Sequence, residues 1–158
     1  RDMARTKIPT AREVMQAKVE TIAVDAELEE AVRMLLGKGL SGAPVVDSEG
    51  ALRGVLSEHD CILVLTRAIS EGWPGGLVES HMTTEIETVP PTEDIFSISS
   101  RFARGQHRRL IVVEKDRPIG LISRRDLLRA LESMEQELTR SKGKTTYELI
   151  GERHNALD

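Results

Sequence analysis

Two copies of one seven-residue motif carry the side chains best suited to chemistry. Gly54-Val55-Leu56-Ser57-Glu58-His59-Asp60 recurs 66 positions later as Gly120-Leu121-Ile122-Ser123-Arg124-Arg125-Asp126, with the glycine, the serine and the aspartate retained. A hydroxyl and a carboxylate three residues apart can bind a polar ligand. They can equally form a capping box, in which both side chains accept hydrogen bonds from backbone N–H groups at the start of a helix. Neither copy pairs a nucleophile with a general base, so the motif favours binding over catalysis and we do not expect an enzyme.

The repetition extends beyond the motif and predicts the architecture of the chain. Val14-Met15 and His81-Met82 stand 67 positions apart, at the beginning of the two copies. The offset falls to 66 between 47–54 and 114–120, a turn-like stretch where the loss of one residue is tolerated. The two motifs therefore occupy equivalent places in a repeated fold.

Each copy has the pattern of a strand, a helix, two strands and a second helix. We expect Asp25 and Thr92 to cap the first helix of each copy. Gly37 or Gly39 ends that helix in the first copy, and Gly105 ends it in the second. The predicted strands are 20–24, 43–47, 52–56, 87–89, 110–113 and 119–122, and the predicted second helices are 60–69 and 126–138. In the first copy, the helices have apolar stripes formed by Leu28, Ala31, Val32, Leu35, Leu36, Ile62, Leu65 and Ile69.

The predicted fold class is α/β, more strictly α+β, with two pseudo-twofold-related βαββα repeats packed into one module. A unit of about 60 residues is marginal alone, so we expect the two repeats to pack on each other, sheet edge against sheet edge. The chain divides into an N-terminal segment 1–11, repeats 12–70 and 78–134, a linker 71–77, and a helix end and tail 135–158. Tyr147 and Ile150 of the tail are predicted to pack across a dimer partner.

This pattern resembles a tandem cystathionine-β-synthase-type (CBS) domain pair, often called a Bateman module, of the small stand-alone kind. The likeness covers roughly residues 12–132 and rests on the two motifs and on Gly42-Ala43-Pro44-Val45-Val46-Asp47 before the first hairpin. It implies a ligand sensor that binds AMP, ADP or ATP in the cleft between the repeats, with S-adenosylmethionine or NAD less favoured. It also implies a homodimer and an unidentified regulated protein on which the module acts in trans.

The resemblance assigns roles to the motif residues. Asp60 and Asp126 would bind the ribose hydroxyls, because a carboxylate accepts two hydrogen bonds from a vicinal diol. Ser57 and Ser123 would lie near the phosphate, which the N-terminus of a helix favours.

Two threonines on the first strands are further candidates. By the same resemblance Thr21 and Thr88 can face the ligand, although the β-propensity of threonine also explains them.

The two copies differ in charge. Glu58 in the first motif repels a phosphate, whereas Arg124 in the second can hold one through two hydrogen bonds. Arg108 and Arg109 precede a strand of the second copy, so we expect the Ser123-Asp126 cleft to be the better nucleotide site. A solvated basic face is the alternative for these arginines, and Arg101 and Arg104 are assigned to it.

Composition limits the other classes of function. The formal net charge is −4 and aromatic residues make up 3% of the chain, which argues against nucleic-acid binding through the basic stretches 101–109 and 124–129. A single cysteine, Cys61, fits a reducing compartment, and no apolar run reaches the roughly 18 residues that span a bilayer, so we expect a cytoplasmic protein without a membrane partner. His59 and Cys61 do not complete a metal site. A dimeric scaffold with a decayed pocket remains the alternative to a sensor.

Overall fold

The structure is a computed structural model that describes residues 7–105 and 107–142. The predicted tail contacts of Tyr147 and Ile150 lie outside the described residues. The elements are α1 (Ala11–Val14), β1 (Ile22–Ala23), α2 (Leu28–Lys38), β2 (Gly42–Val46), β3 (Leu52–Ser57), α3 (Glu58–Glu71), η1 (Val78–Ser80), β4 (Thr88–Val89), α4 (Ile95–Arg104), β5 (Arg109–Glu114), β6 (Arg117–Ser123) and α5 (Arg124–Lys142).

Two three-stranded sheets repeat one topology. In the first sheet β1 is parallel to β2 and β2 is antiparallel to β3, and β4, β5 and β6 form the second sheet in the same way. The predicted α+β fold of two βαββα repeats is confirmed. The first strands are shorter than predicted, with two residues each.

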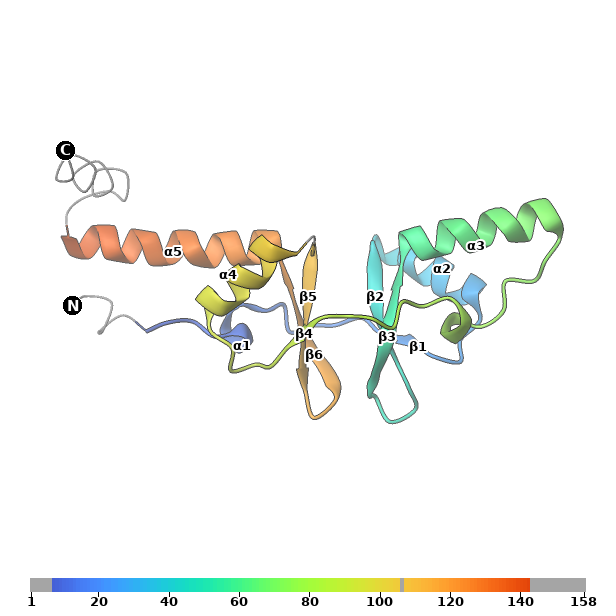
Figure 1. Ribbon diagram of the computed structural model, residues 1–158, viewed down its shortest axis with the longest axis horizontal. Helices are drawn as coiled ribbons and strands as arrows, with labels where there is room; N and C mark the ends of the chain where they lie inside the picture. Colours follow the sequence, from blue (N-terminus) through green and yellow to red (C-terminus); the bar gives the residue numbers. More distant parts are fainter. Residues whose placement is uncertain (1–6, 106, 143–158) are drawn as a thin grey trace.

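The sheets meet by their faces and not by their edges, which corrects the prediction. In Figure 1 the two sheets stand side by side in the middle of the molecule, and the helices lie on their outer sides. Val45 and Val112 are fully buried on the helix side of their sheets, whereas Val55, Ile111 and Leu121 line a cavity between the sheets. Strands with apolar residues on both faces are buried on both faces. Here the helices pack on the outer face of each sheet, and the other sheet lies against the inner face.

Each repeat sends its leading segment to the other repeat. We call residues 11–16 and 78–83 the leading segments. Ala11 of α1 is fully buried in the core formed by β4–β6, α4 and α5, and Val78 of η1 is fully buried in the core of the first sheet. Isolated bridges continue the exchange, since Gln16 pairs with Leu121 and Thr83 pairs with Val55. The two halves are therefore completed by each other's chain.

The motif glycines make this exchange possible. A Cβ atom on Gly120 would collide with the side chain of Met15, and one on Gly54 would lie 2.8 Å from both the Sδ atom of Met82 and the carbonyl oxygen of Thr83. Only a residue without a side chain fits at these positions. In each half, the repeated glycine thus leaves the space that the repeated methionine of the other repeat fills.

Two predicted helix caps are wrong. Asp94, not Thr92, caps α4, and its Oδ1 atom accepts hydrogen bonds from the backbone N–H groups of Phe96 and Ser97, both at 2.9 Å. α2 begins after Glu27, not after Asp25, because the N–H of Leu28 donates to the carbonyl of Gly76 in the linker at 2.9 Å.

The apolar stripe of α3 does not face the core as amphipathicity suggests. Ile62 and Ile69 are 63% and 84% exposed, whereas Cys61 is buried. Leu36 of α2 is also exposed, and Gly39, at a φ of 64°, ends that helix while Gly37 lies inside it. α3 therefore has one apolar side in the core and a second one at the surface.

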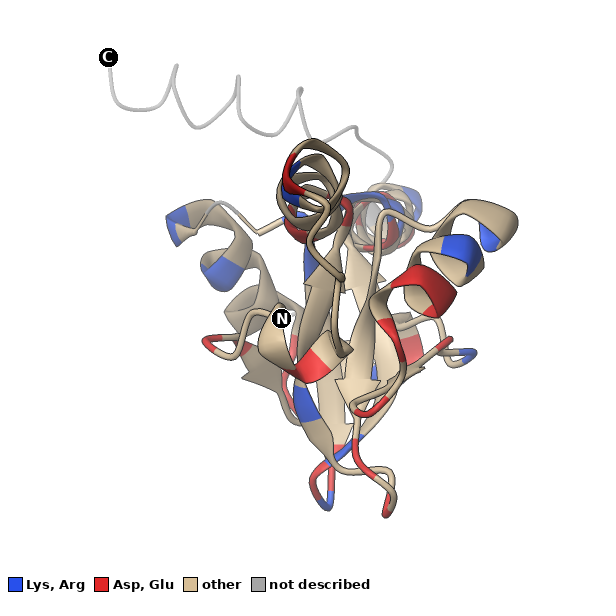
Figure 2. Ribbon diagram, turned by 90° about the vertical axis from the view of Figure 1, so that its right-hand side faces the viewer, with Lys and Arg blue, Asp and Glu red and all other residues tan. Residues whose placement is uncertain are grey.

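Charged residues lie mainly on the helices, loops and hairpin tips (Figure 2), and the strands carry few, among them Arg53 of β3, Arg109 of β5 and Arg117 of β6. Among the described residues, no helix has both the length and the apolar composition needed to cross a lipid bilayer.

Candidate ligand-binding site

Both motifs form the capping box. In the first, the N–H of Asp60 donates to Ser57 Oγ at 3.2 Å, and the N–H of Ser57 donates to Asp60 Oδ2 at 3.0 Å. In the second, the corresponding distances for Asp126 and Ser123 are 3.1 and 2.9 Å. Each serine hydroxyl also donates to Oδ2 of its aspartate at 2.9 Å. The predicted capping box is confirmed at both turns. It uses only one oxygen of each carboxylate, Oδ2.

The other carboxylate oxygen points to the leading segment of the opposite repeat. Asp126 Oδ1 accepts a hydrogen bond from Gln16 Nε2 at 2.9 Å. Asp60 Oδ1 lies 3.5 Å from Thr83 Oγ1, at the limit of a hydrogen bond. Gln16 and Thr83 are 67 positions apart, so the two contacts are equivalent in the repeat. The capping box uses the Oδ2 atom of each aspartate, and a ligand would use Oδ1. This second oxygen lies at the boundary between the repeats.

Asp126 is held ionised by its surroundings. Burial raises its pKa, but hydrogen bonds from the backbone and side chain of Ser123 and from Gln16, together with the charge of Arg129, outweigh burial and hold the pKa of Asp126 below its usual value. The carboxylate is an acceptor only, as a diol requires.

A cavity of about 290 Å³ lies between the two sheets, beside the N-terminus of α3. Its walls are mainly apolar, and polar groups stand at its rim. It is lined by Ser41, Gly42, Ala43, Pro44, Val55, Ser57, Glu58, His59, Arg108, Arg109, Ile111 and Leu121. Such a lining suits a flat apolar group with an anionic end.

The structure pairs the predicted residues differently from the sequence analysis. Arg108 and Arg109 line the cavity at Ser57 of the first motif, and Arg109 also pairs with Ser123 of the second motif in the ladder between β5 and β6. Arg124 donates from Nε to the backbone carbonyl of His107 at 3.1 Å. These arginines were assigned to the second motif because they belong to the second repeat, but the start of β5 faces α3 across the sheet interface.

A larger and more polar cavity adjoins Asp126. It has a volume of about 450 Å³ and lies between α5 and the chain that carries α1. Charges of both signs line it, from Lys7, Glu13, Asp126, Arg129 and Glu137. Pro9, Val14, Ala130 and Met134 supply its apolar lining, so this second cavity is mixed in character where the first one is mainly apolar.

The two predicted threonines lie elsewhere. Thr21 lines a shallow pocket of about 180 Å³ beside α2, and Thr88 lines a cavity of about 430 Å³ near the hairpins, together with Asp47, Arg53 and Asp116. Their contact with a ligand stays a prediction.

Sequence reasoning missed Gln16 and Thr83, which contact the motif aspartates. The signal was present, because each residue directly follows the repeated methionine at the same 67-residue offset.

Arg101 is not part of a solvated basic face, which corrects its assignment. Its side chain is 25% exposed and is bound to the carboxylates of Glu87 and Glu93. Arg104 is exposed, and its Nε atom donates to the carbonyl of Ser100 at 3.3 Å. In the basic stretch 101–109, the charge of Arg101 is therefore neutralised by neighbouring carboxylates and is not available to a nucleic acid.

Within residues 7–105 and 107–142, no three His, Cys, Asp or Glu side chains come together as a possible metal site. Cys61 of α3 is buried, and this burial raises the pKa of its thiol.

Known proteins are similar to this chain in sequence. The sequence profile described as CBS domain matches residues 11–67 and 78–133. The uncharacterized protein MJ1225 of Methanocaldococcus jannaschii is 30% identical over 122 residues, which are 77% of this chain and 42% of that protein. The chain spans only 23% and 13% of two further curated relatives, a homoserine O-acetyltransferase from Methanococcoides burtonii and an A-adding tRNA nucleotidyltransferase from Geobacter sulfurreducens.

Solved structures have the same fold. CBSX2 of Arabidopsis thaliana in complex with AMP is 24% identical with a TM-score of 0.68, and the match covers 80% of this chain and 98% of that one. The CBS domain pair of protein MJ0100, in complex with 5′-methylthioadenosine and S-adenosyl-L-methionine, is 19% identical with a TM-score of 0.64, and the match covers 81% and 99%.

Proposed function

The chain belongs to the CBS domain family, and from this premise we propose that it is a regulatory module that binds an adenosine-type ligand between its repeats and acts on a separate protein. Two structures of the same fold contain such ligands, AMP in CBSX2 and S-adenosyl-L-methionine with 5′-methylthioadenosine in MJ0100. The observation that carries the proposal is the Oδ1 atom of each motif aspartate, which lies outside the capping box at the boundary between the repeats, and which at Asp60 has only a 3.5 Å contact with Thr83.

The first motif is our preferred site. Asp60 Oδ1 has only a long contact with Thr83, so the ribose hydroxyls can replace that contact at little cost. The base would enter the apolar cavity between the faces of the two sheets, which Ser57, Glu58 and His59 line and which ends one residue before Asp60 in the motif. The phosphate would meet Ser57, Arg108 and Arg109 at the N-terminus of α3. AMP, ADP and ATP share these groups and are the proposed ligands.

Binding at this site is coupled to the contact between the repeats. The ligand would exchange a hydrogen bond between Asp60 and the opposite leading segment for its own hydroxyls, while Arg109 of the second repeat would approach Ser57 of the first. A ligand shifts an equilibrium by its differential affinity for the two arrangements. A regulated partner that reads the angle between the repeats would therefore sense the nucleotide.

We propose that a second copy of the chain covers the exposed side of α3. Ile62, Leu63 and Ile69 are 63%, 57% and 84% exposed there. The equivalent positions on α5 are Leu128, Arg129 and Glu135, so the apolar surface is concentrated on the first repeat. Apolar patches of this kind on small proteins mark interaction surfaces, and the pairing of α3 with α3 of the other copy buries apolar groups against apolar groups.

A thermal-shift titration with AMP, ADP, ATP, S-adenosylmethionine and NAD tests the proposed function. A ligand at 100 times its dissociation constant adds about 2.7 kcal/mol to the free energy of unfolding. We expect a shift with at least one adenine nucleotide, lost in Asp60→Asn and retained in Asp94→Asn, a matched control that alters a helix cap outside the site. No shift with any of the five compounds would overturn the proposal.

One observation favours a second function. Glu58 lines the same cavity as Arg108 and Arg109, and its carboxylate would oppose a phosphate. A constitutive dimeric scaffold would need no ligand, and it would keep its oligomeric state and its partner in the presence and absence of nucleotide.

A further inference from the structure

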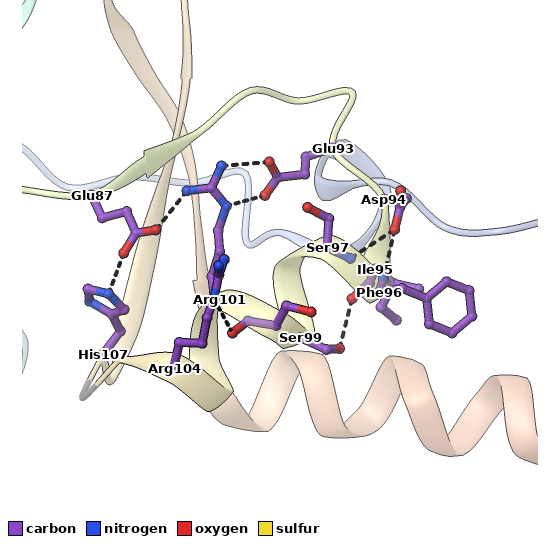
Figure 3. Close-up of polar contacts among 11 residues, drawn as sticks. Glu87, Glu93, Asp94, Ile95, Phe96, Ser97, Ser99, Arg101, Arg104 and His107 are labelled. Carbon is purple, nitrogen blue, oxygen red and sulfur yellow. Dashed lines mark hydrogen bonds and ion pairs between the residues drawn. The ribbon is translucent and has the colours of Figure 1, made fainter.

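Arg101 of α4 binds two carboxylates at once (Figure 3). Its Nε and Nη2 atoms donate to the two oxygens of Glu93 at 2.6 and 2.7 Å, and its Nη1 atom donates to Glu87 Oε1 at 2.7 Å. Glu93 lies before α4 and Glu87 lies directly before β4. The guanidinium therefore fastens the helix to the chain that leads into the second sheet, with the planar geometry that arginine favours.

The same network reaches the start of β5. The second oxygen of Glu87 is bound to His107 Nε2, and the backbone carbonyl of His107 accepts a hydrogen bond from Arg124 Nε at 3.1 Å. His107 is thus held at its side chain by Glu87, directly before β4, and at its backbone by Arg124, the first residue of α5. The next two residues along the chain are Arg108 and Arg109, which line the cavity between the sheets.

The charges in the network reinforce one another. The hydrogen bond from Arg101 holds the pKa of Glu87 below its usual range, and the nearby His107 acts in the same direction. Hydrogen bonds to Glu93 and Glu87 raise the pKa of Arg101. Glu87 is therefore held as a carboxylate, which accepts hydrogen bonds from both Arg101 and His107.

The first repeat has no such arrangement. At the same offset of 67 residues, Met34 stands for Arg101 and Leu40 stands for His107. Glu20, the equivalent of Glu87, pairs with Lys38 at 2.7 Å. The residues that follow Leu40 are Ser41 and Gly42, which carry no charge. The network occurs in the repeat that presents two arginines to the cavity.

We propose that Arg101, Glu87 and His107 are positioning residues that fix Arg108 and Arg109 for an anionic phosphate group, and so set a preference for nucleotide over nucleoside. This inference rests on the proposed function. None of the three residues lines the cavity. They act by holding the backbone at His107, because a segment that becomes ordered only on binding loses backbone conformational entropy at that step, in addition to the rotamer entropy of its arginines.

The ratio of the affinities for AMP and adenosine tests the proposal, measured by calorimetric titration on the full chain. We expect Glu87→Gln and His107→Ala to lower this ratio about tenfold, with adenosine affinity unchanged. His107→Gln should restore the ratio, because the glutamine amide can donate to Glu87 as the imidazole does. Glu20→Gln is the matched control in the first repeat, and it should leave the ratio as in the wild type. The ratio is taken on one protein at a time, so a general loss of stability moves both affinities and does not imitate the effect.

Inorganic pyrophosphate separates failure of the inference from failure of the proposed function. A wild-type chain that binds AMP, with an unchanged ratio in Glu87→Gln and His107→Ala, overturns the inference alone. An equal fall in Glu20→Gln overturns it as well. A wild-type chain that binds neither adenosine, AMP nor pyrophosphate overturns both.

Discussion

At the first motif, Asp60 keeps one carboxylate oxygen 3.5 Å from Thr83, and the adjoining cavity has apolar walls with Arg108 and Arg109 at its rim. At the second motif, Asp126 is bound to Gln16 at 2.9 Å, and the adjoining cavity has charges of both signs. The backbone of the two turns is the same. The comparison teaches that the motif determines the turn, whereas residues supplied by the opposite repeat determine which contacts the second carboxylate oxygen makes; under the proposed function, those contacts decide which turn takes the ligand.

The two leading segments pack differently against the motif glycines, and substitutions there should change the free energy of unfolding most. Gly54→Ala and Gly120→Ala each force a methyl group into occupied space, which costs about 1–3 kcal/mol. Met15→Ala should partly rescue Gly120→Ala, because the close atoms there belong to the Met15 side chain. Met82→Ala should not rescue Gly54→Ala, because the carbonyl of Thr83 remains in place. Urea unfolding of the single and double variants measures this difference, and equal rescue at both sites would contradict it.

The affinity for AMP should depend on the first site only. Arg109→Ala removes a charge-assisted contact to phosphate and should weaken binding about tenfold. Arg129→Ala, beside Asp126, removes the same charge from the second cavity and should leave the affinity unchanged. Titration of the two variants compares the cavities directly, and a larger loss in Arg129→Ala would reverse our assignment.

Self-association should depend on α3 more than on α5. Ile62→Asp places a charge on the apolar side of α3, and Leu128→Asp places one at the equivalent position of α5. We expect the dimer dissociation constant to rise about fivefold more in Ile62→Asp, because its neighbours Leu63 and Ile69 are apolar. Sedimentation equilibrium gives both constants. A monomeric wild-type chain would rule out the interface.

The smallest expected effect is the acid dependence of the second turn. The pKa of Asp126 is lowered in the folded state, so its ionisation stabilises the fold above the usual pKa of 3.8, and this contribution is lost as the pH falls through the folded-state pKa. The stability difference between the wild type and Asp126→Asn should therefore shrink between pH 6 and pH 3. Urea midpoints at the two pH values measure it, and a constant difference would assign Asp126 a purely geometric role.

The repeat made much of the fold predictable from sequence. The two motifs, the aliphatic strands and the 66-residue offset located both sheets and both capping boxes, because these features depend on residues that are close in the chain. The beginning of α2 was misplaced because a distant residue decides it, whereas α4 is capped locally by Asp94, two residues after the predicted Thr92. Distant carbonyls do accept the first N–H group of both helices. Leu28 donates to Gly76, and the N–H of Ile95 donates to the carbonyl of Pro9 at 3.0 Å.

The candidate site was predictable only in part. The aspartates and serines follow from the motif, but the partners of Asp60 and Asp126 come from the opposite repeat. The sequence predicts Arg108 and Arg109 only beside Ser123, and it does not reveal that they also line the cavity at Ser57, since sequence distance does not show which turn lies across a sheet interface. Arg101 was misread because its two carboxylate partners lie 8 and 14 residues away, beyond the reach of helix periodicity.

The exchange of leading segments has a consequence for how the protein emerges from the ribosome. Ala11 is among the first described residues to be synthesised, yet it packs against a core that is complete only when Leu127 and Met134 have been made. The first sheet likewise waits for Val78. The core of the first sheet can therefore close once Val78 and Met82 have been made, whereas the core that receives Ala11 waits for Met134, so the two halves should close in order on the ribosome and α1 should dock last.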